Sequence, residues 1–143
     1  PCAKVYKGGS VTKYGDVNTI KGINIETVPA YNIIVKKTGS HPWGFANGYV
    51  LTFGNMRVYA AGETEKIPEM DQLKNIDIAF FSVDSVFNMT PEMAAEAAKV
   101  IMPKILYPIH FTPTFMNNIS DLDVLKKLLN DTKEIEIRIR KME

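Results

Sequence analysis

Hydrophobic and polar residues alternate in the first sixty residues in a way that is typical of antiparallel strands. Residues 22–31 alternate, and residues 32–39 form a second short apolar run that ends at a glycine. The clearest hairpin joins residues 49–53 to residues 56–61 through Gly54-Asn55, a pair suited to the positive φ of a tight turn. The pattern predicts an antiparallel meander.

The second half of the chain alternates buried strands with helices. Residues 76–83 and 104–109 are almost entirely apolar, as expected of strands that are buried on both faces. Residues 134–140 alternate and predict a closing strand. Helices are predicted over 91–102 and from Ser120-Asp121 onward, so the order is strand–helix–strand–helix–strand. Such units favour right-handed crossovers and a partly parallel sheet, which gives a mixed α/β fold.

Local signals support these helices. Thr90 is a suitable N-cap, Pro91 suits the first helical position, and Pro103 ends the same helix. A further helix is predicted to begin at Pro68. The predicted apolar stripes are Ile67, Met70 and Leu73; Met93, Ala97 and Ile101; and Leu122, Leu125, Leu128 and Leu129.

Polar residues follow the predicted strands of the second half. Glu63 follows one strand directly, Asp84 and Ser85 follow the next, and His110 follows the third. Ligands of open sheets gather outside the carboxyl ends of the strands. If these strands are neighbours, the four residues lie at one edge of the sheet.

The other histidine, His41, lies in a loop over 38–48 that has three glycines, a proline and a tryptophan, which is a plausible composition for a binding loop. Two imidazoles and a carboxylate are a common set of three ligands for Zn²⁺. His41, Glu63 and His110 are therefore candidate metal ligands, and Asp84 is in a position to add another. Trp43 is a candidate substrate-binding residue.

Each of these residues also has a structural interpretation. His110 can pack beside Pro108 with its ring bonded to backbone, and Glu63 can be an acid favoured at a helix start. Trp43 and Phe45 can fill core beneath their loop.

Length and charge exclude several classes of protein. The chain has 143 residues, which predicts one domain over 1–143, and its net charge of +1 gives no electrostatic footprint for nucleic acid. No apolar run approaches the length of a membrane span, and no signal peptide is expected from the pattern. The single cysteine, Cys2, cannot form an internal disulfide, so a cytoplasmic location is the default expectation.

The order and spacing of several segments resemble a known family. They are "VPAYN", "HPWGFANGYVLTFGNMRVYAAGETEKIPEM", "IDIAFFSV" and "MTPEMAAEAAKVIMPKILYPIHF". Over roughly residues 20–112 they resemble the carboxyl-terminal half of metallo-β-lactamase-fold hydrolases, near the ascorbate-6-phosphate lactonases. Family members share a His-Pro-x-Gly loop, a strand ending in Ala-Gly-Asp-Thr, a Thr-x-x-Glu-Ala-Ala helix and a Pro-x-His strand end.

The resemblance implies half of an αββα sandwich, with helices on the outer face of a mixed sheet. In the family two metal ions, usually zinc or manganese, activate a water that attacks a lactone, amide or phosphoester. The resemblance assigns ligand roles to His41, to Glu63 in place of the family aspartate, and to His110. No catalytic base is assigned.

The chain departs from the family in two ways. Glu63 is one methylene longer than aspartate, about 1.5 Å of extra reach, so bridging two ions in the usual geometry is not expected. The family's His-x-His-x-Asp-His motif is absent, because the chain has only two histidines. We therefore expect at most one ion in this chain alone.

Two functional interpretations stay open. The first is a metal-dependent hydrolase, a fragment or divergent member that is completed by a missing amino-terminal companion segment or by a homodimer. The alternative is a non-catalytic metallo-β-lactamase-like domain that acts as a binding or assembly module.

Overall fold

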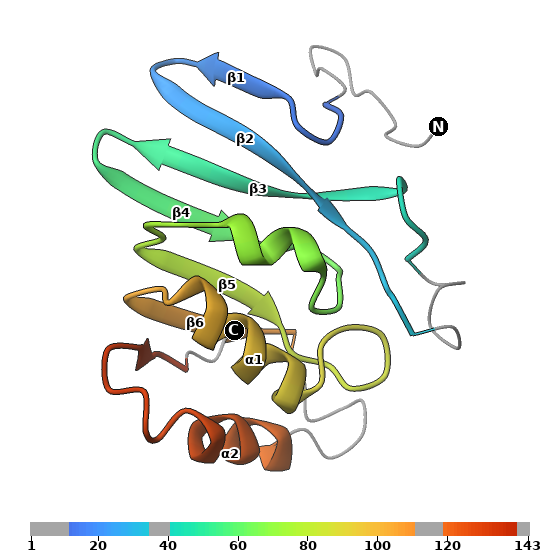
Figure 1. Cartoon of the computed structure of the whole chain (residues 1–143), viewed down its shortest axis with the longest axis vertical. Coiled ribbons are helices and arrows are strands. Elements are labelled where there is room, and N and C mark those ends of the chain that lie inside the picture. Colours follow the sequence, from blue (N-terminus) through green and yellow to red (C-terminus); the bar gives the residue numbers. More distant parts are fainter. Residues whose placement is uncertain (1–11, 35–40, 111–118, 140–143) are drawn as a thin grey trace.

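The computed structural model describes residues 12–34, 41–110 and 119–139. Within these ranges seven strands form one mixed sheet, in the order β1-β2-β3-β4-β5-β6-β7 (Figure 1). The strands are β1 Val17–Ile20, β2 Ile23–Ala30, β3 Ala46–Phe53, β4 Met56–Ala60, β5 Ile78–Ser82, β6 Ile105–Ile109 and β7 Glu136–Ile137. The helices are the 3₁₀ helix η1 Pro68–Gln72, α1 Pro91–Ile101 and α2 Ile119–Leu128.

Strands β1 to β4 form the predicted antiparallel meander. Phe53 faces Met56 across the predicted Gly54-Asn55 turn. A second tight turn joins β1 to β2, with φ of 52° at Lys21 and 80° at Gly22. Two positive φ values suit the right-handed twist of a hairpin. Strand β1 was not predicted from the sequence, because lysine is not a residue that signals positive φ.

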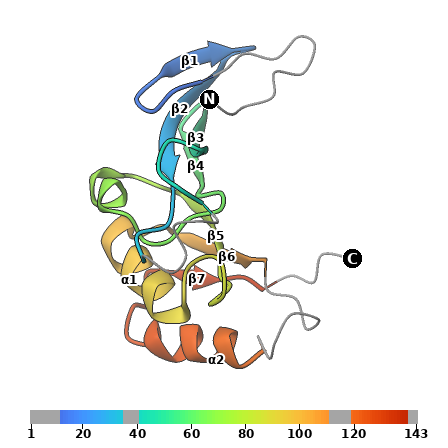
Figure 2. The ribbon, with the colours of Figure 1, turned by 90° about the vertical axis from the view of Figure 1, so that its right-hand side faces the viewer.

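Strands β4 to β7 are parallel to one another, as the alternation of strands and helices predicted. Right-handed crossovers between strands in sequential order place all the connecting helices on one face. Figure 2 shows η1 and α1 on the same side of the sheet. Helix α1 starts at the predicted cap, where the Thr90 hydroxyl accepts from the Met93 amide. It ends at Met102, whose backbone is in the left-handed region, directly before Pro103.

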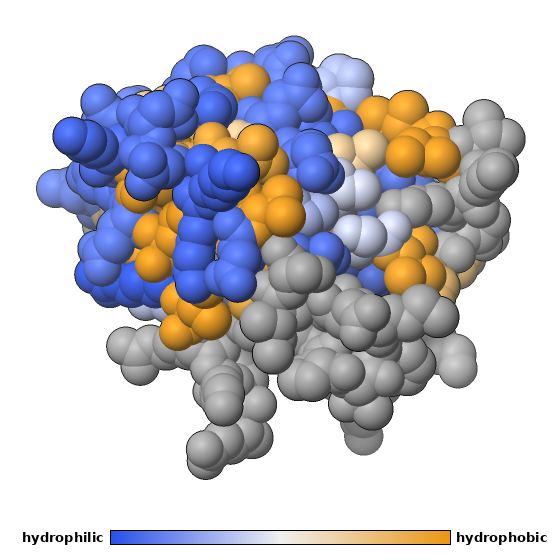
Figure 3. All heavy atoms as spheres, turned by 90° about the horizontal axis from the view of Figure 1, so that it is seen from below, coloured by the Kyte–Doolittle hydropathy of each residue, from blue (hydrophilic) through white to orange (hydrophobic). Residues whose placement is uncertain are grey.

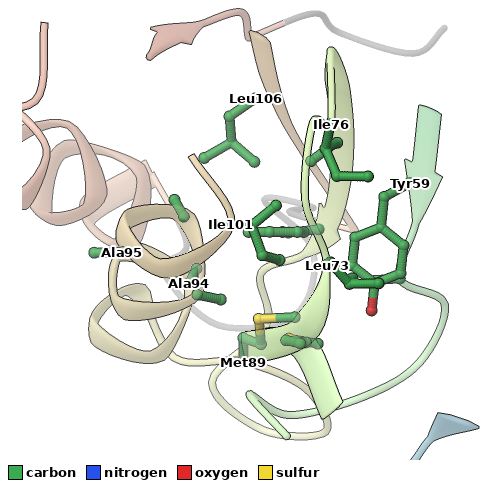
Figure 4. Close-up of a cluster of buried hydrophobic side chains, with 14 of the residues drawn as sticks. Tyr59, Leu73, Ile76, Met89, Ala94, Ala95, Ile101 and Leu106 are labelled. Carbon is green, nitrogen blue, oxygen red and sulfur yellow. The ribbon is translucent and has the colours of Figure 1, made fainter. Parts of the chain in front are cut away.

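The core lies between the sheet and these helices. Tyr59 of β4 and Phe81 of β5 meet edge to face, with ring centroids 6.2 Å apart. Met89, Ile101 and Leu106 close the cluster around them (Figure 4). Burial of such apolar surface is the main stabilising contribution to the fold. The core fills the helical side of the sheet, and the candidate polar residues lie at the strand ends.

The other face of the sheet carries a row of half-buried apolar side chains. Val58, Ile78, Phe80, Ile105 and Tyr107 alternate along their strands with fully buried core residues. No helix among the residues that the structure describes lies over this face (Figure 2). Figure 3, a view from below, shows hydrophobic residues at the surface in separate groups among hydrophilic ones.

Three predicted elements differ from the observed ones. Residues 32–34 are not a strand, because the amides of Ile33 and Ile34 bond to the Glu65 carboxylate instead of a neighbouring strand; residues 35–39 lie outside the described ranges. The helix from Pro68 is a 3₁₀ helix of five residues. Of the described residues of the predicted closing strand, 134–139, two form β7 and pair with β6.

The described part of the chain contains no helix that is long and apolar enough to cross a membrane.

Candidate functional site at the carboxyl ends of the parallel strands

Polar side chains converge where β4, β5 and β6 end. Because these strands are parallel neighbours, Glu63, Asp84 and His110 all follow them at the same edge of the sheet. The Ser82 hydroxyl donates to the Gly62 carbonyl at 3.0 Å and ties the ends of β4 and β5 together. The predicted common edge is therefore confirmed.

Glu63 and His110 meet at this edge although β5 separates their strands. Glu63 Oε2 lies 3.6 Å from His110 Nδ1, and both side chains are partly exposed. The buried Asn88 stands between them: its Nδ2 donates to Glu63 Oε2 at 2.8 Å and lies 3.3 Å from His110 Nδ1. His110 also adopts a φ of 66°, which is unusual for a residue other than glycine. Among the described residues, the contacts of both side chains lie at this edge and not at a helix start or with backbone groups.

His41 has a similar neighbour. Asn32 Nδ2 lies 3.4 Å from His41 Nδ1 and donates to the Phe87 carbonyl at 2.8 Å. The backbone amide of Asn32 also donates to the backbone carbonyl of His41 at 2.8 Å. The loop that carries His41 is thereby attached to the loop that carries Asn88.

A buried carboxylate holds the segment between β2 and the His41 loop. Glu65 is fully buried, and its Oε2 accepts from the amides of Ile33 and Ile34 at 2.7 and 2.8 Å. The Thr64 hydroxyl accepts from the Tyr31 amide at 3.0 Å. The segment that follows Glu63 therefore anchors residues 31–34 on the site edge.

The other candidate residues have different surroundings. Asp84 is buried and turned into its own loop, where Oδ1 accepts from the Val86 amide at 2.9 Å. Ser85 Oγ donates to Asp121 of α2 at 2.9 Å. Trp43 is 66% exposed and Phe45 is 56% exposed, so neither fills core. Cys2 lies outside the described residues.

The donor set of this edge does not make a metal centre by itself. Within residues 12–34, 41–110 and 119–139, no three His, Cys, Asp or Glu side chains lie close enough to hold a metal ion. Two of the three predicted ligands, Glu63 and His110, come together, while His41 is placed with Asn32. A zinc site needs at least three protein ligands in most proteins. The ligand assignment stays a prediction.

Sequence reasoning missed three residues that organise this edge. Asn32, Asn88 and Glu65 act through hydrogen bonds to partners 9 to 55 positions away. Buried asparagine and glutamate have no local spacing rule. The one available signal was the "TEK" that follows Glu63, in which three polar residues precede the buried Ile67.

The sequence also matches a protein family. Residues 4–110 match the model of the beta-lactamase superfamily domain. The chain belongs to this superfamily. Its sheet with helices on one face is half of a metallo-β-lactamase fold: the metallo-β-lactamase-fold protein YhfI of Bacillus subtilis shares the fold with a TM-score of 0.67 at 15% identity, over 93% of this chain and 53% of that one.

Two relatives indicate which members of the superfamily the chain is similar to. The chain is 30% identical to a UPF0173 metal-dependent hydrolase of Thermococcus onnurineus, over 82% of this chain and 53% of that protein. It is 46% identical to a crystal structure of a candidate metal-dependent hydrolase of Parabacteroides distasonis, with a TM-score of 0.84, over 94% of this chain and 59% of that one. This member of the superfamily thus groups with metal-dependent hydrolases and spans little more than half of their length.

Proposed function

We propose that the chain supplies one half of the site of a metal-dependent hydrolase that cleaves a lactone, amide or phosphoester bond. The observation that carries the proposal is the approach of Glu63 to His110 at 3.6 Å, at the strand ends where ligands of open sheets bind. The similarity to the Thermococcus and Parabacteroides proteins supports it. Zinc or manganese is the proposed metal.

In this proposal the described residues provide only part of the site. Glu63 contributes a carboxylate and His110 an imidazole, and the exposed ring of Trp43 offers an apolar contact to substrate. The remaining ligands come from a partner, because the described residues contain no group of three. The chain alone is therefore inactive.

We further propose that the partner covers the open face of the sheet. Half-buried apolar side chains such as Val58 and Ile105 need cover, as on any sheet that is packed on both faces. The proposed cover is an amino-terminal companion segment equivalent to the part of the Parabacteroides protein that this chain does not match. A second copy of the chain is the other outcome of the test.

A second candidate function is a non-catalytic binding or assembly module of the same fold. It is favoured by the hydrogen bonds that Asn88 makes to both Glu63 and His110, since these bonds satisfy the pair without a metal.

Reconstitution tests the two candidates. The chain is mixed with the amino-terminal segment of the Parabacteroides protein, and hydrolysis of chromogenic esters and phosphoesters is followed with added Zn²⁺ or Mn²⁺. We expect no turnover above buffer from either piece and turnover from the mixture, abolished by His110→Ala. Metal-dependent turnover by the chain alone that His110→Ala removes would contradict the need for a companion. A stable but inactive complex would favour the binding module.

A further inference from the structure

Both histidines of the chain face the side-chain amide of a buried asparagine. His110 Nδ1 lies 3.3 Å from Asn88 Nδ2, and His41 Nδ1 lies 3.4 Å from Asn32 Nδ2. The two asparagines are 0% and 2% exposed, respectively. In both pairs the same ring nitrogen therefore meets an amide nitrogen.

A second acceptor fixes the orientation of each amide. Asn88 Nδ2 also donates to Glu63 Oε2, and Asn32 Nδ2 also donates to the Phe87 carbonyl, each at 2.8 Å. Rotating either amide by half a turn would set its carbonyl oxygen against one of these oxygens. Each amide therefore keeps an N–H for its histidine, and a neutral imidazole that accepts at Nδ1 carries its proton on Nε2.

This arrangement opposes metal binding. A histidine ligand needs a free lone pair on one ring nitrogen, and its other nitrogen usually donates to a carboxylate or a carbonyl. In His110 the Nδ1 lone pair faces the Asn88 N–H, and Nε2 carries the proton. Asn88 Nδ2 also contacts Glu63, so one amide satisfies both groups that a cation would join.

We propose that Asn88 is a hydrogen-bonding substitute for a cation between Glu63 and His110, and that Asn32 and Asn88 together hold both histidines in the tautomer that does not ligate through Nε2. The inference concerns the metal affinity of this chain by itself; in the proposed hydrolase a metal held jointly with a companion would have to displace the hydrogen bonds of Asn88. The tests below use the chain alone, so their failure is distinguishable from a failure of the proposed hydrolase.

The Asn88→Asp variant tests directly whether Asn88 takes the place of a cation. The change replaces the N–H donors with a carboxylate of nearly the same shape and gives three ligand groups around one point. We expect the parent chain to bind Co²⁺ weakly and Asn88→Asp to bind one ion per chain at least tenfold more tightly, with the visible absorption of four-coordinate Co²⁺. Equal affinity of the parent and Asn88→Asp would overturn the proposal.

The chain provides a matched control. Asn32→Asp makes the same change beside the other histidine, whose contacts with the described part of the chain include no carboxylate, and we expect it to gain no Co²⁺ affinity. A gain in both variants would contradict the specific role of Asn88. Adding His110→Ala to Asn88→Asp should abolish the gain, and a gain that persists would place the ion elsewhere and overturn the proposal.

A second measurement needs no ion and no buried carboxylate. Long-range ¹H–¹⁵N spectra of the parent chain, recorded above the histidine titration range, report which ring nitrogen carries the proton. We expect each histidine to show Nε2–H alone, and Asn88→Ala to return only His110 to the mixture of tautomers that an unconstrained imidazole shows. Nδ1–H on His110 in the parent, or no change in Asn88→Ala, would overturn the proposal.

Discussion

Phe80 and Tyr107 stack on the open face of the sheet, with ring centroids 5.1 Å apart and planes inclined by 13°. They are cross-strand partners on β5 and β6, and their neighbours along each strand point into the core. Such stacking orders the side chains of this face without covering them. Contiguous apolar faces of this kind are typical of interaction surfaces.

We therefore predict that the isolated chain self-associates through this face. Light scattering on dilute protein should give a mass above the 16.0 kDa of one chain. Phe80→Asp should weaken association at least tenfold, because it places a charge in the contact. Val124→Asp, at an exposed position of α2 on the helical side of the sheet, is the control and should leave association unchanged. A stable, cooperatively melting monomer of the parent would rule out the idea.

The metal content of the chain gives a second prediction. We expect at most one zinc ion per chain after zinc exposure, and Glu63→Asp should not create a second site. Shortening residue 63 alters the reach of its carboxylate but not the number of ligands, and two ions each need several nitrogen or oxygen ligands. Elemental analysis of both proteins measures this. Two tightly held ions in either one would show that further residues complete the centre.

Glu65 should be the most important carboxylate for stability. Glu65→Ala removes the acceptor of the Ile33 and Ile34 amides, and each lost hydrogen bond costs about 0.5–1.5 kcal/mol, so we expect a loss of about 1–3 kcal/mol in the free energy of unfolding. Chemical denaturation measures the loss, and hydrogen exchange should show both amides unprotected. Glu96→Ala, at an exposed position of α1, is the control and should change stability little. Protected amides in Glu65→Ala would contradict this role.

Short-range sequence patterns account for the parts of the fold that could be predicted from the sequence. The Gly54-Asn55 turn, the Thr90 cap and the apolar runs of β5 and β6 each depend on a few neighbouring residues. The same rules placed Glu63 and His110 at one edge, because parallel strands share their carboxyl ends.

The remaining features depend on contacts between distant residues. Residues 32–34 have the composition of a strand, yet the amides of Ile33 and Ile34 bond to a glutamate about thirty positions away. Asn88 lies between the side chains of Glu63 and His110, which follow two other strands, and no sequence spacing predicts this contact. Sequence patterns thus located the site edge, whereas the way in which its side chains satisfy one another required the three-dimensional structure.

The last prediction concerns acid stability at the opposite end of the sheet. Asp77 precedes β5, and its carboxylate accepts from Lys104 Nζ at 2.7 Å and from the Arg57 amide at 2.8 Å. The hydrogen bond from Lys104, followed by that from the Arg57 amide, lowers the pKa of Asp77 below its usual 3.8. A pKa that is lower in the folded state adds stability above the unfolded value of about 3.8, and this stability is lost as the pH falls through the folded pKa.

Asp77→Asn should therefore lower the free energy of unfolding at neutral pH by about 1 kcal/mol, the typical contribution of one hydrogen bond. The difference in unfolding free energy between Asp77→Asn and the parent should shrink as the pH falls below 3.8, because the Asp77 carboxylate of the parent becomes protonated there. Urea denaturation across this range measures both. Asp123→Asn, which removes an exposed charge on α2, should show no comparable pH dependence. A deficit in Asp77→Asn that stays constant into acid would show that the stabilisation comes from packing and not from the ionised carboxylate.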